Sequence, residues 1–398
     1  MPFHKNYDIV VVGGGISGIA AALAAARAGK KVALIEKTVL LGGLATTGLI
    51  YIYLPLCDGY GKQVTFGIAE ELLKLSIKYG PGNIPEGWKN KESKNEVKRL
   101  QTTFSPASFI LAIDEVLQEA NIDVWLDSLV CNTTLDESNK ITGILIENDS
   151  GRVKVKAKCF IDASGSALLV RRSGGEVKLG NNSLTFWTQE RVKGNHNNFI
   201  ADNVKITPYG SDAADKEKLI YRGACGEMTS DFILKGRKLL LDHYTQLYKQ
   251  GIANRFDTFP LALPAMAQFR KIAAIKGEKE LHDDQHGVYV EDSIGIVSDW
   301  RKPGLNWEIP FGTMLPVNLK GVLVAGRSIA SFGDAWEVTR VIPAAAVTGE
   351  VAGIAASIAV EKNILPGKLN IKDLQHKLYD KDFKLHLPEL GLKYLKRQ

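Results

Sequence analysis

Three glycines near the N-terminus, Gly13, Gly15 and Gly18, have the GxGxxG spacing of a dinucleotide-binding turn. Gly13 lets the chain turn sharply, Gly15 lets the backbone approach a pyrophosphate, and Gly18 lets a helix pack closely against a sheet. Glu36 follows 23 residues after Gly13, and its carboxylate can accept hydrogen bonds from ribose hydroxyls. These residues predict a site for a nucleotide, and the acid disfavours a 2′-phosphate.

The segments around these glycines have a βαβ pattern. Residues 7–12 are β-branched and predict a buried parallel strand. Residues 16–28 are rich in Ala and Leu and predict a helix that Gly29 ends. Residues 31–35 predict the second strand. The start of the helix would direct free N–H groups and a positive dipole end at the phosphates, so Ile16 and Ser17 are expected contacts.

Further segments along the chain also carry local structural signals. A Gly-Gly pair, Gly42 and Gly43, lies shortly after Glu36. Residues 104–106 (FSP) predict a helix start with Ser as the N-cap, residues 123–130 predict a strand, and residues 159–165 (CFIDASG) end a predicted hairpin. Residues 321–327 (GVLVAGR) predict a last strand. Small residues at 344–346 precede a helix predicted to extend to about residue 360.

The order and spacing of these segments resemble the FAD-dependent oxidoreductases with a glutathione-reductase-like FAD-binding fold, and most of all a bacterial family named FAD-dependent oxidoreductase. The glycine motif alone leaves NAD and FAD open, and the resemblance implies FAD. It implies contacts with the adenosine and pyrophosphate, an adenine contact from the backbone of residue 130, and flavin contacts from the last strand and helix. The implied cofactor residues are Lys37, Gly42, Gly43, Leu44, Ala45, Thr46, Val130, Ala163, Ser164, Gly165, Gly326, Arg327 and Ala346. Ser164 stands where the family usually has Thr, which keeps the hydroxyl.

The expected fold class is α/β, with a Rossmann-type FAD-binding domain and an inserted α+β substrate domain. The FAD-binding domain would comprise residues 1–175 and 311–398, and residues 176–310 would form the substrate or cap domain. Within that insert, residues 183–189 predict a strand and residues 231–250 a helix. A chain of 398 residues is long enough for two domains.

The candidate catalytic residues are Arg270 and Arg340. Arg270 could bind a substrate carboxylate through two hydrogen bonds, and a structural salt bridge is an equal alternative. Arg340 stands before the last helix, where it could face the substrate or the flavin. The family tends to have several arginines around residue 270, so this departure leaves the charge of its active site open.

The predicted function is an FAD-dependent oxidoreductase that transfers a hydride between a small-molecule substrate and flavin N5. The alternatives are a flavin-fold binding protein and an electron-transfer subunit with a partner chain. An RNA-modifying flavoprotein is disfavoured by the net charge of +6 and by the lack of an aromatic-basic cluster. No second GxGxxG and no CxxxxC dithiol occur, which disfavours a disulfide reductase.

The four cysteines form no CxxC pair, and no His/Cys cluster has zinc spacing, so no metal is expected. Free thiols fit a cytoplasmic protein, and no apolar run suggests a membrane span. His4 is the only histidine near the glycine motif and precedes the strand, so FAD is expected to be non-covalent. The expected partners are a small-molecule substrate and either a second copy or a redox partner, with no nucleic acid.

Overall fold

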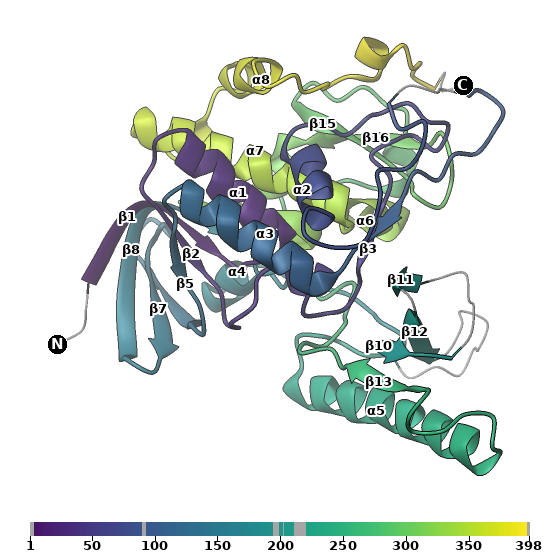
Figure 1. The fold of residues 1–398 in the computed structure, drawn as a ribbon. Coiled ribbons are helices and arrows are strands. Elements are labelled where there is room, and N and C mark those ends of the chain that lie inside the picture. The colour runs from purple at the N-terminus through teal and green to yellow at the C-terminus, as the bar shows by residue number, and fades with distance from the viewer. Residues whose placement is uncertain (1–3, 90–92, 194–198, 202, 211–219, 396–398) are drawn as a thin grey trace.

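The computed structural model describes residues 4–89, 93–193, 199–201, 203–210 and 220–395 (Figure 1). Within these residues the largest sheet has seven strands in the order β5-β2-β1-β8-β7-β6, with β17 paired to the end of β8. The strands are β1 (His4–Val12), β2 (Val32–Ile35), β5 (Asp123–Trp125), β6 (Leu129–Leu135), β7 (Ile141–Asn148), β8 (Gly151–Asp162) and β17 (Val322–Val324).

Parallel pairing brings the carboxyl ends of four strands to one edge of this sheet. Val12 at the end of β1 pairs with Ile35 of β2 on one side and with Asp162 of β8 on the other. Val324 of β17 also pairs with Asp162. Ligands of open parallel sheets bind beyond such carboxyl ends, so the fold places the predicted motifs where a nucleotide would lie.

Side chains of β1 alternate between two hydrophobic cores, as expected for a strand that is buried on both faces. Ile9 and Val11 pack into the core that contains α1 (Ile16–Arg27) and α7 (Ile342–Glu361). Val10 enters the core on the other face of the sheet, together with residues of β6, β7 and the segment around residue 270. Figure 1 shows α1, α3 (Pro106–Glu119) and α7 gathered on one side of the strands.

Helices α1 and α7 approach each other very closely because small residues line their contact. A Cβ added to Gly349 would lie 2.2 Å from the carbonyl oxygen of Ser17, and one added to Gly353 would lie 2.3 Å from that of Ala21. Helix α7 is long and apolar enough to cross a membrane, yet 94% of its most apolar window is buried inside the protein. It is therefore a core helix that fixes the position of α1.

Residues 185–262 contain a separate lobe, labelled at the bottom of Figure 1. Four antiparallel strands pair in the order β11-β12-β10-β13, and α5 (Gly226–Lys249) packs on one face of them. Phe186 fills this contact, since a Cβ on Gly236 of α5 would lie 2.3 Å from its ring. The strands are β10 (Thr185–Arg191), β11 (Phe199–Ala201), β12 (Val204–Gly210) and β13 (Phe259–Ala262).

Gln268 links the lobe to the loop that follows Gly43. The amide of Gln268 donates to the carbonyl of Gly48 at 2.5 Å and accepts from the N–H of Trp187 at 2.7 Å. The lobe lies within the segment predicted as the substrate domain. Strand β15 (Ser293–Ser298) belongs to the same segment of sequence but contacts α7 and α8 (Ile371–Tyr379), and it pairs with β16 (Asn306–Pro310). The domain boundaries at 175 and 310 remain predictions.

The remaining elements are short and connect these parts. They are α2 (Ile68–Ser76), α4 (Leu168–Arg172), α6 (Gly333–Thr339) and α8 (Ile371–Tyr379), and the strand pairs β3 (Ile52–Tyr53) with β4 (Thr102–Thr103), β9 (Val177–Leu179) with β14 (Ala273–Ile275), and β15 (Ser293–Ser298) with β16 (Asn306–Pro310).

Several predicted elements differ from those observed. Residues 123–130 form two strands rather than one, because Asp127 has a φ of +46° and its N–H bonds to the carbonyl of Thr38. Helix α7 begins at Ile342, before the alanines, since Pro343 is favourable in a first helical turn. Helix α5 begins at Gly226, before residue 231. The predicted N-cap of α3 is confirmed, because the side chain of Ser105 accepts from a backbone N–H in the first turn.

Candidate functional site

Close backbone contacts hold the glycine turn after β1 in place and leave space in front of Gly15. Gly13 has a φ of +103°, and a Cβ there would lie 2.6 Å from the carbonyl oxygen of Ala163. Gly18 has the packing role expected of it, since its Cβ would meet the Gly13 carbonyl at 1.8 Å. A Cβ on Gly15, in contrast, would have no atom within 4 Å. The open space in front of Gly15 is the place that the motif predicts for a pyrophosphate.

The second glycine pair lies directly beside the first turn. Gly42 pairs with Gly15, and its N–H donates to the carbonyl of Gly14 at 2.8 Å. A Cβ on Gly43 would lie 3.1 Å from the Cα of Gly15. Helix α1 starts at Gly15 without any side-chain cap, so its first N–H groups have no intrahelical partner and face this space. The cradle thus fits an anionic diphosphate.

Glu36 takes part in building this cradle. Its carboxylate accepts from the N–H of Gly14 at 2.7 Å and from the N–H and hydroxyl of Thr38 at 3.0 Å each. A carboxylate has about four lone-pair sites, so it can still accept from a ribose hydroxyl. Sequence reasoning assigned Glu36 to the ribose alone and missed its hold on the glycine turn.

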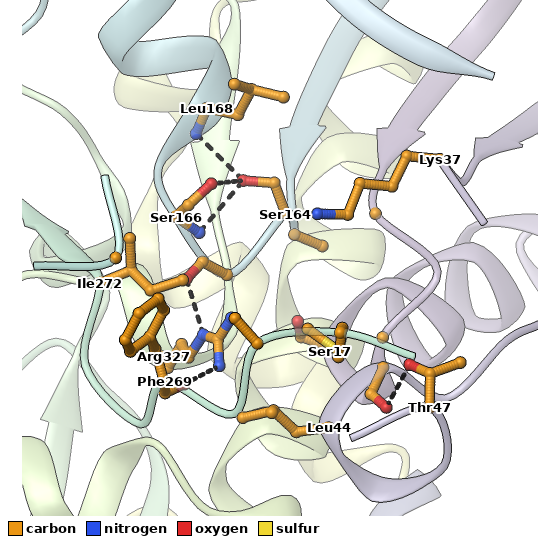
Figure 2. A pocket seen from close by; sticks show the side chains of 18 of the residues that line it. Ser17, Lys37, Leu44, Thr47, Ser164, Ser166, Leu168, Phe269, Ile272 and Arg327 are labelled. Carbon is orange, nitrogen blue, oxygen red and sulfur yellow. Dashed lines mark hydrogen bonds between the residues drawn. The ribbon is translucent and has the colours of Figure 1, made fainter. Parts of the chain in front are cut away.

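The end of β8 forms the wall opposite the glycine turn. Asp162 is fully buried, and its carboxylate accepts from the hydroxyl of Ser164 at 2.6 Å and from the N–H of Leu169 at 2.8 Å. Burial raises the pKa of Asp162, while these hydrogen bonds oppose the rise. The Ser164 hydroxyl accepts in turn from the N–H groups of Ser166 and Leu168 (Figure 2). The serine that replaces the family's usual Thr therefore orders the start of α4.

Arg327, after β17, connects this wall to the segment that follows the lobe. Its Nε donates to the carbonyl of Gly165 at 2.6 Å and its Nη1 donates to the carbonyl of Phe269 at 2.7 Å, as Figure 2 shows. Burial and the nearby Arg340 lower the pKa of Arg327 to about 10. Two of its N–H donors thus hold the backbone at Gly165 and Phe269. The sequence did not indicate this role.

A cavity of about 510 Å³ runs between these segments. This volume lies within the range of about 300 to 1,000 Å³ that is usual for ligand sites. The predicted residues that line it are Gly13, Gly15, Ile16, Ser17, Glu36, Lys37, Gly42, Gly43, Leu44, Ala45, Ala163, Ser164, Gly165, Arg327 and Arg340. Segments far apart in the sequence therefore meet at one cavity, at the carboxyl edge of the sheet.

Six predicted residues do not line the cavity. They are Gly18, Thr46, Val130, Arg270, Gly326 and Ala346. Thr46 is buried and its hydroxyl donates to the carbonyl of Leu41, while Val130 is buried in β6. Ala346 is fully buried, and Ile342 and Ala345 of the same helix line the cavity instead.

Several lining residues were not predicted. They come mainly from the loop after Gly43–Ala45, α4 and the residues before it, the start of α5, the segment at 265–272 and the start of α7. They comprise Thr38, Thr47, Ser166, Leu168, Arg171, Arg172, Gly223, Ala224, Cys225, Gly226, Thr229, Ala265, Met266, Ala267, Phe269, Ile272, Ile342 and Ala345. The basic pair Arg171 and Arg172, six residues after the CFIDASG motif, was a signal that could have indicated the contribution of α4. The loop at 265–267 carries no pattern of its own.

Helix α7 points its first turn into the cavity. It starts after Val341 without a side-chain cap, and Ile342 and Ala345 line the cavity beside Arg340. A helix of 20 residues presents a positive dipole end at this point. This arrangement suits the stabilisation of negative charge on a ligand at this end of the cavity.

Among the described residues, no group of three or more His, Cys, Asp or Glu side chains could hold a metal ion. All four cysteines are free thiols. Burial raises the pKa of Cys57 to about 12, which keeps that thiol protonated and unreactive.

The comparison with known families gives one match over most of the chain. The model described as FAD dependent oxidoreductase matches residues 8–258 and 263–378. The chain therefore belongs to the FAD-dependent oxidoreductase family, and FAD is its cofactor. The open space before Gly15 and the uncapped helices α1 and α7 are consistent with this cofactor.

Curated relatives share only part of their length with this chain. It is 29% identical over 203 residues to the tRNA uridine 5-carboxymethylaminomethyl modification enzyme MnmG of Lactococcus lactis subsp. lactis, a match that covers 46% of this chain and 29% of that protein. It is 29% identical over 168 residues to the digeranylgeranylglycerophospholipid reductase of Thermoplasma volcanium, which covers 40% of each. The chain thus spans less than half the length of these relatives.

A solved structure with a similar fold is the p-nitrophenol 4-monooxygenase PnpA from Pseudomonas putida DLL-E4. It is 13% identical, with a TM-score of 0.51, over 94% of this chain and 84% of that chain. At this identity the similarity shows the fold alone.

Proposed function

We propose that this protein transfers a hydride between a small-molecule substrate and N5 of FAD. The observation that supports this reaction is the single cavity that joins the glycine cradle at Gly15 to Arg340, the start of α7 and the lobe segment at Phe269. Such a cavity can hold a dinucleotide at one end and place a second molecule against it at the other end.

The residues of this chain would bind, orient and shield the reactants. When bound, FAD supplies an N5 atom that accepts or donates a hydride. The start of α7 stabilises negative charge at the end of the cavity near Arg340. Met266, Phe269 and Ile272 line the lobe side with apolar surface that excludes water. Gln268 and Arg327 hold in place the segment after the lobe that contains Phe269.

The reaction can be tested with the purified holoprotein under anaerobic conditions. Its visible flavin absorption would be followed while candidate small molecules are added, first with hydrogen and then with deuterium at the carbon to be oxidised. We expect bleaching by a substrate, with a primary isotope effect on its rate. Bleaching by one-electron donors alone would contradict hydride transfer, and failure to bind FAD would contradict the whole assignment.

An electron-transfer subunit remains the second candidate, and one surface feature favours it. Four large apolar side chains on and after α5 are more than 60% exposed, namely Leu234, Leu241, Ile252 and Phe256. A redox partner chain or a second copy could cover this surface. Reduction of the flavin by a partner protein but by no small molecule would favour this candidate.

The remaining alternatives have less support. A binding protein that has lost its flavin would not need the open cradle before Gly15. A nucleic-acid substrate is not part of the proposal, because the net charge is only +6. A cytoplasmic location is part of it, supported by the four free thiols.

A further inference from the structure

Four basic side chains meet where the lobe segment, the end of β17 and α6 come together. They are Arg270, Lys271, Arg327 and Arg340. Among the described residues, the carboxylate that forms ion pairs within this group is that of Glu337, which pairs with Lys271 and Arg340. Its Oε1 lies 2.7 Å from Lys271 Nζ, and its Oε2 accepts from Arg340 Nε at 2.7 Å. The group therefore carries an excess of positive charge beside the cavity.

The arginines of this group differ in how their donors are used. Arg327 is bonded to two backbone carbonyls, and Arg340 is bonded to Glu337. Arg270 makes one side-chain hydrogen bond, from Nη1 to the carbonyl of Gln268 at 3.0 Å. Among the described residues no carboxylate forms an ion pair with Arg270. Most of the five N–H donors of this guanidinium thus have no acceptor among the described residues.

The surroundings of Arg270 make an unpaired charge costly. Burial, followed by repulsion from Arg340 and Arg327, lowers its pKa to about 9. Its guanidinium lies 5.8 Å from the ring centroid of Trp187, and the Nε1 of this ring is buried without a hydrogen-bond partner in the described part of the chain. A partly buried cation without an acidic partner among the described residues indicates a place for an anion.

The cofactor's pyrophosphate does not account for this charge. The cradle for it lies at Gly15 and Gly43, next to the start of α1. Arg270 is not part of the cavity lining, whereas its neighbours Phe269, Arg327 and Arg340 are. It therefore stands at the edge of the lobe end of the cavity, where a substrate rather than the pyrophosphate would lie.

We propose that Arg270, with the adjacent Arg340, binds the carboxylate of an anionic substrate. This inference rests on the proposed function, of which it names the substrate class. A planar guanidinium fork matches a carboxylate through two parallel hydrogen bonds. One negative charge would also reduce the repulsion between Arg270 and Arg340.

The subsite can be tested by binding alone, without turnover. The holoprotein would be titrated with sodium benzoate and sodium acetate, with the neutral benzamide and inorganic phosphate as comparison probes, and the flavin difference spectrum recorded. We expect saturable binding of the carboxylates, weakened about tenfold or more in Arg270→Gln, because a charged hydrogen-bonded pair is lost. The matched control is Arg255→Gln, an exposed lobe arginine that stacks on Phe256 and should leave binding unchanged.

Arg270→Lys keeps the charge but not the fork, and should give an intermediate loss. It also carries the test if Arg270→Gln fails to fold or to hold FAD. Equal binding of benzoate and benzamide, or unchanged benzoate binding in both variants, would overturn the proposal. Tighter binding of phosphate than of either carboxylate would overturn the carboxylate assignment. A protein that binds benzoate through Arg270 but whose flavin accepts no hydride would refute the proposed function and leave the subsite standing.

Discussion

Glu350 is a buried carboxyl group in the middle of α7, the helix whose start points into the cavity. Its side chain accepts from the N–H of Ile68, the first residue of α2, at 2.6 Å, and the residue is 3% exposed. Burial raises the pKa of Glu350 from 4.5 to about 7, although the hydrogen bond from Ile68 and the charges of Lys381 and Arg27 oppose this. The change we consider is Glu350→Gln, which keeps an acceptor for Ile68 and removes the charge.

The sign of the effect follows from the direction of this pKa change. Because the folded-state pKa is raised, the folded protein holds a proton that the unfolded chain has released. The stability from Glu350 is complete below pH 4.5 and is lost as the pH rises to about 7. Each pKa unit corresponds to about 1.4 kcal/mol, so the loss amounts to about 3 kcal/mol. Glu350→Gln should therefore be more stable than the wild type by about this amount above pH 7, and near equal to it in acid.

The measurement is urea unfolding of both proteins at several pH values, with FAD held at one saturating concentration because bound ligand adds to stability. The matched control is Glu361→Gln at the end of the same helix, where the side chain is 74% exposed, and it should not change the pH dependence. An equal stability difference between Glu350→Gln and wild type at all pH values would refute the reasoning, because the effect would then not come from ionisation.

Four further substitutions separate the cofactor site from the fold. Gly15→Ala should leave folding intact but weaken FAD binding about 10- to 100-fold, because its methyl group would enter the open cradle. Apoprotein stability and fluorescence titration with FAD check this. Gly18→Ala should instead unfold the protein. Arg327→Gln should lose about 1.5–3 kcal/mol of stability, seen in thermal unfolding, because the carbonyl of Gly165 loses its charged donor; an unchanged melting temperature would contradict this role. Gly349→Ala should separate α1 from α7 and lower both stability and FAD retention, whereas retained flavin at full stability would show that these helices can shift.

The glycine motif was readable because its chemistry is local. The turn at Gly13, the uncapped start of α1 and the acid at Glu36 lie within one βαβ unit, and strand and helix periods identify that unit directly. The sequence still did not show every role of these residues. The bond from Gly14 to Glu36 depends on how the turn folds back, which spacing alone does not specify.

Helix boundaries were less predictable than helix identity. The alanines after residue 343 predicted the position of α7, but its start at Ile342 decided that Ala345 rather than Ala346 lines the cavity. One residue corresponds to a rotation of about 100° around a helix, so an uncertain phase changes which side chain faces a ligand.

The sequence by itself determined the FAD-binding class, because the segments that bind the cofactor keep their order and local patterns along the chain. Only the tertiary structure showed that Arg270 and Arg327 lie near Arg340 and that Arg340 pairs with Glu337. It also showed that Arg327 holds two carbonyls, while Arg270 forms no ion pair within the described residues. These contacts join residues that lie dozens of positions apart. No periodicity records them, since they depend on how the lobe packs against the sheet, and packing between distant segments leaves no local pattern in the sequence.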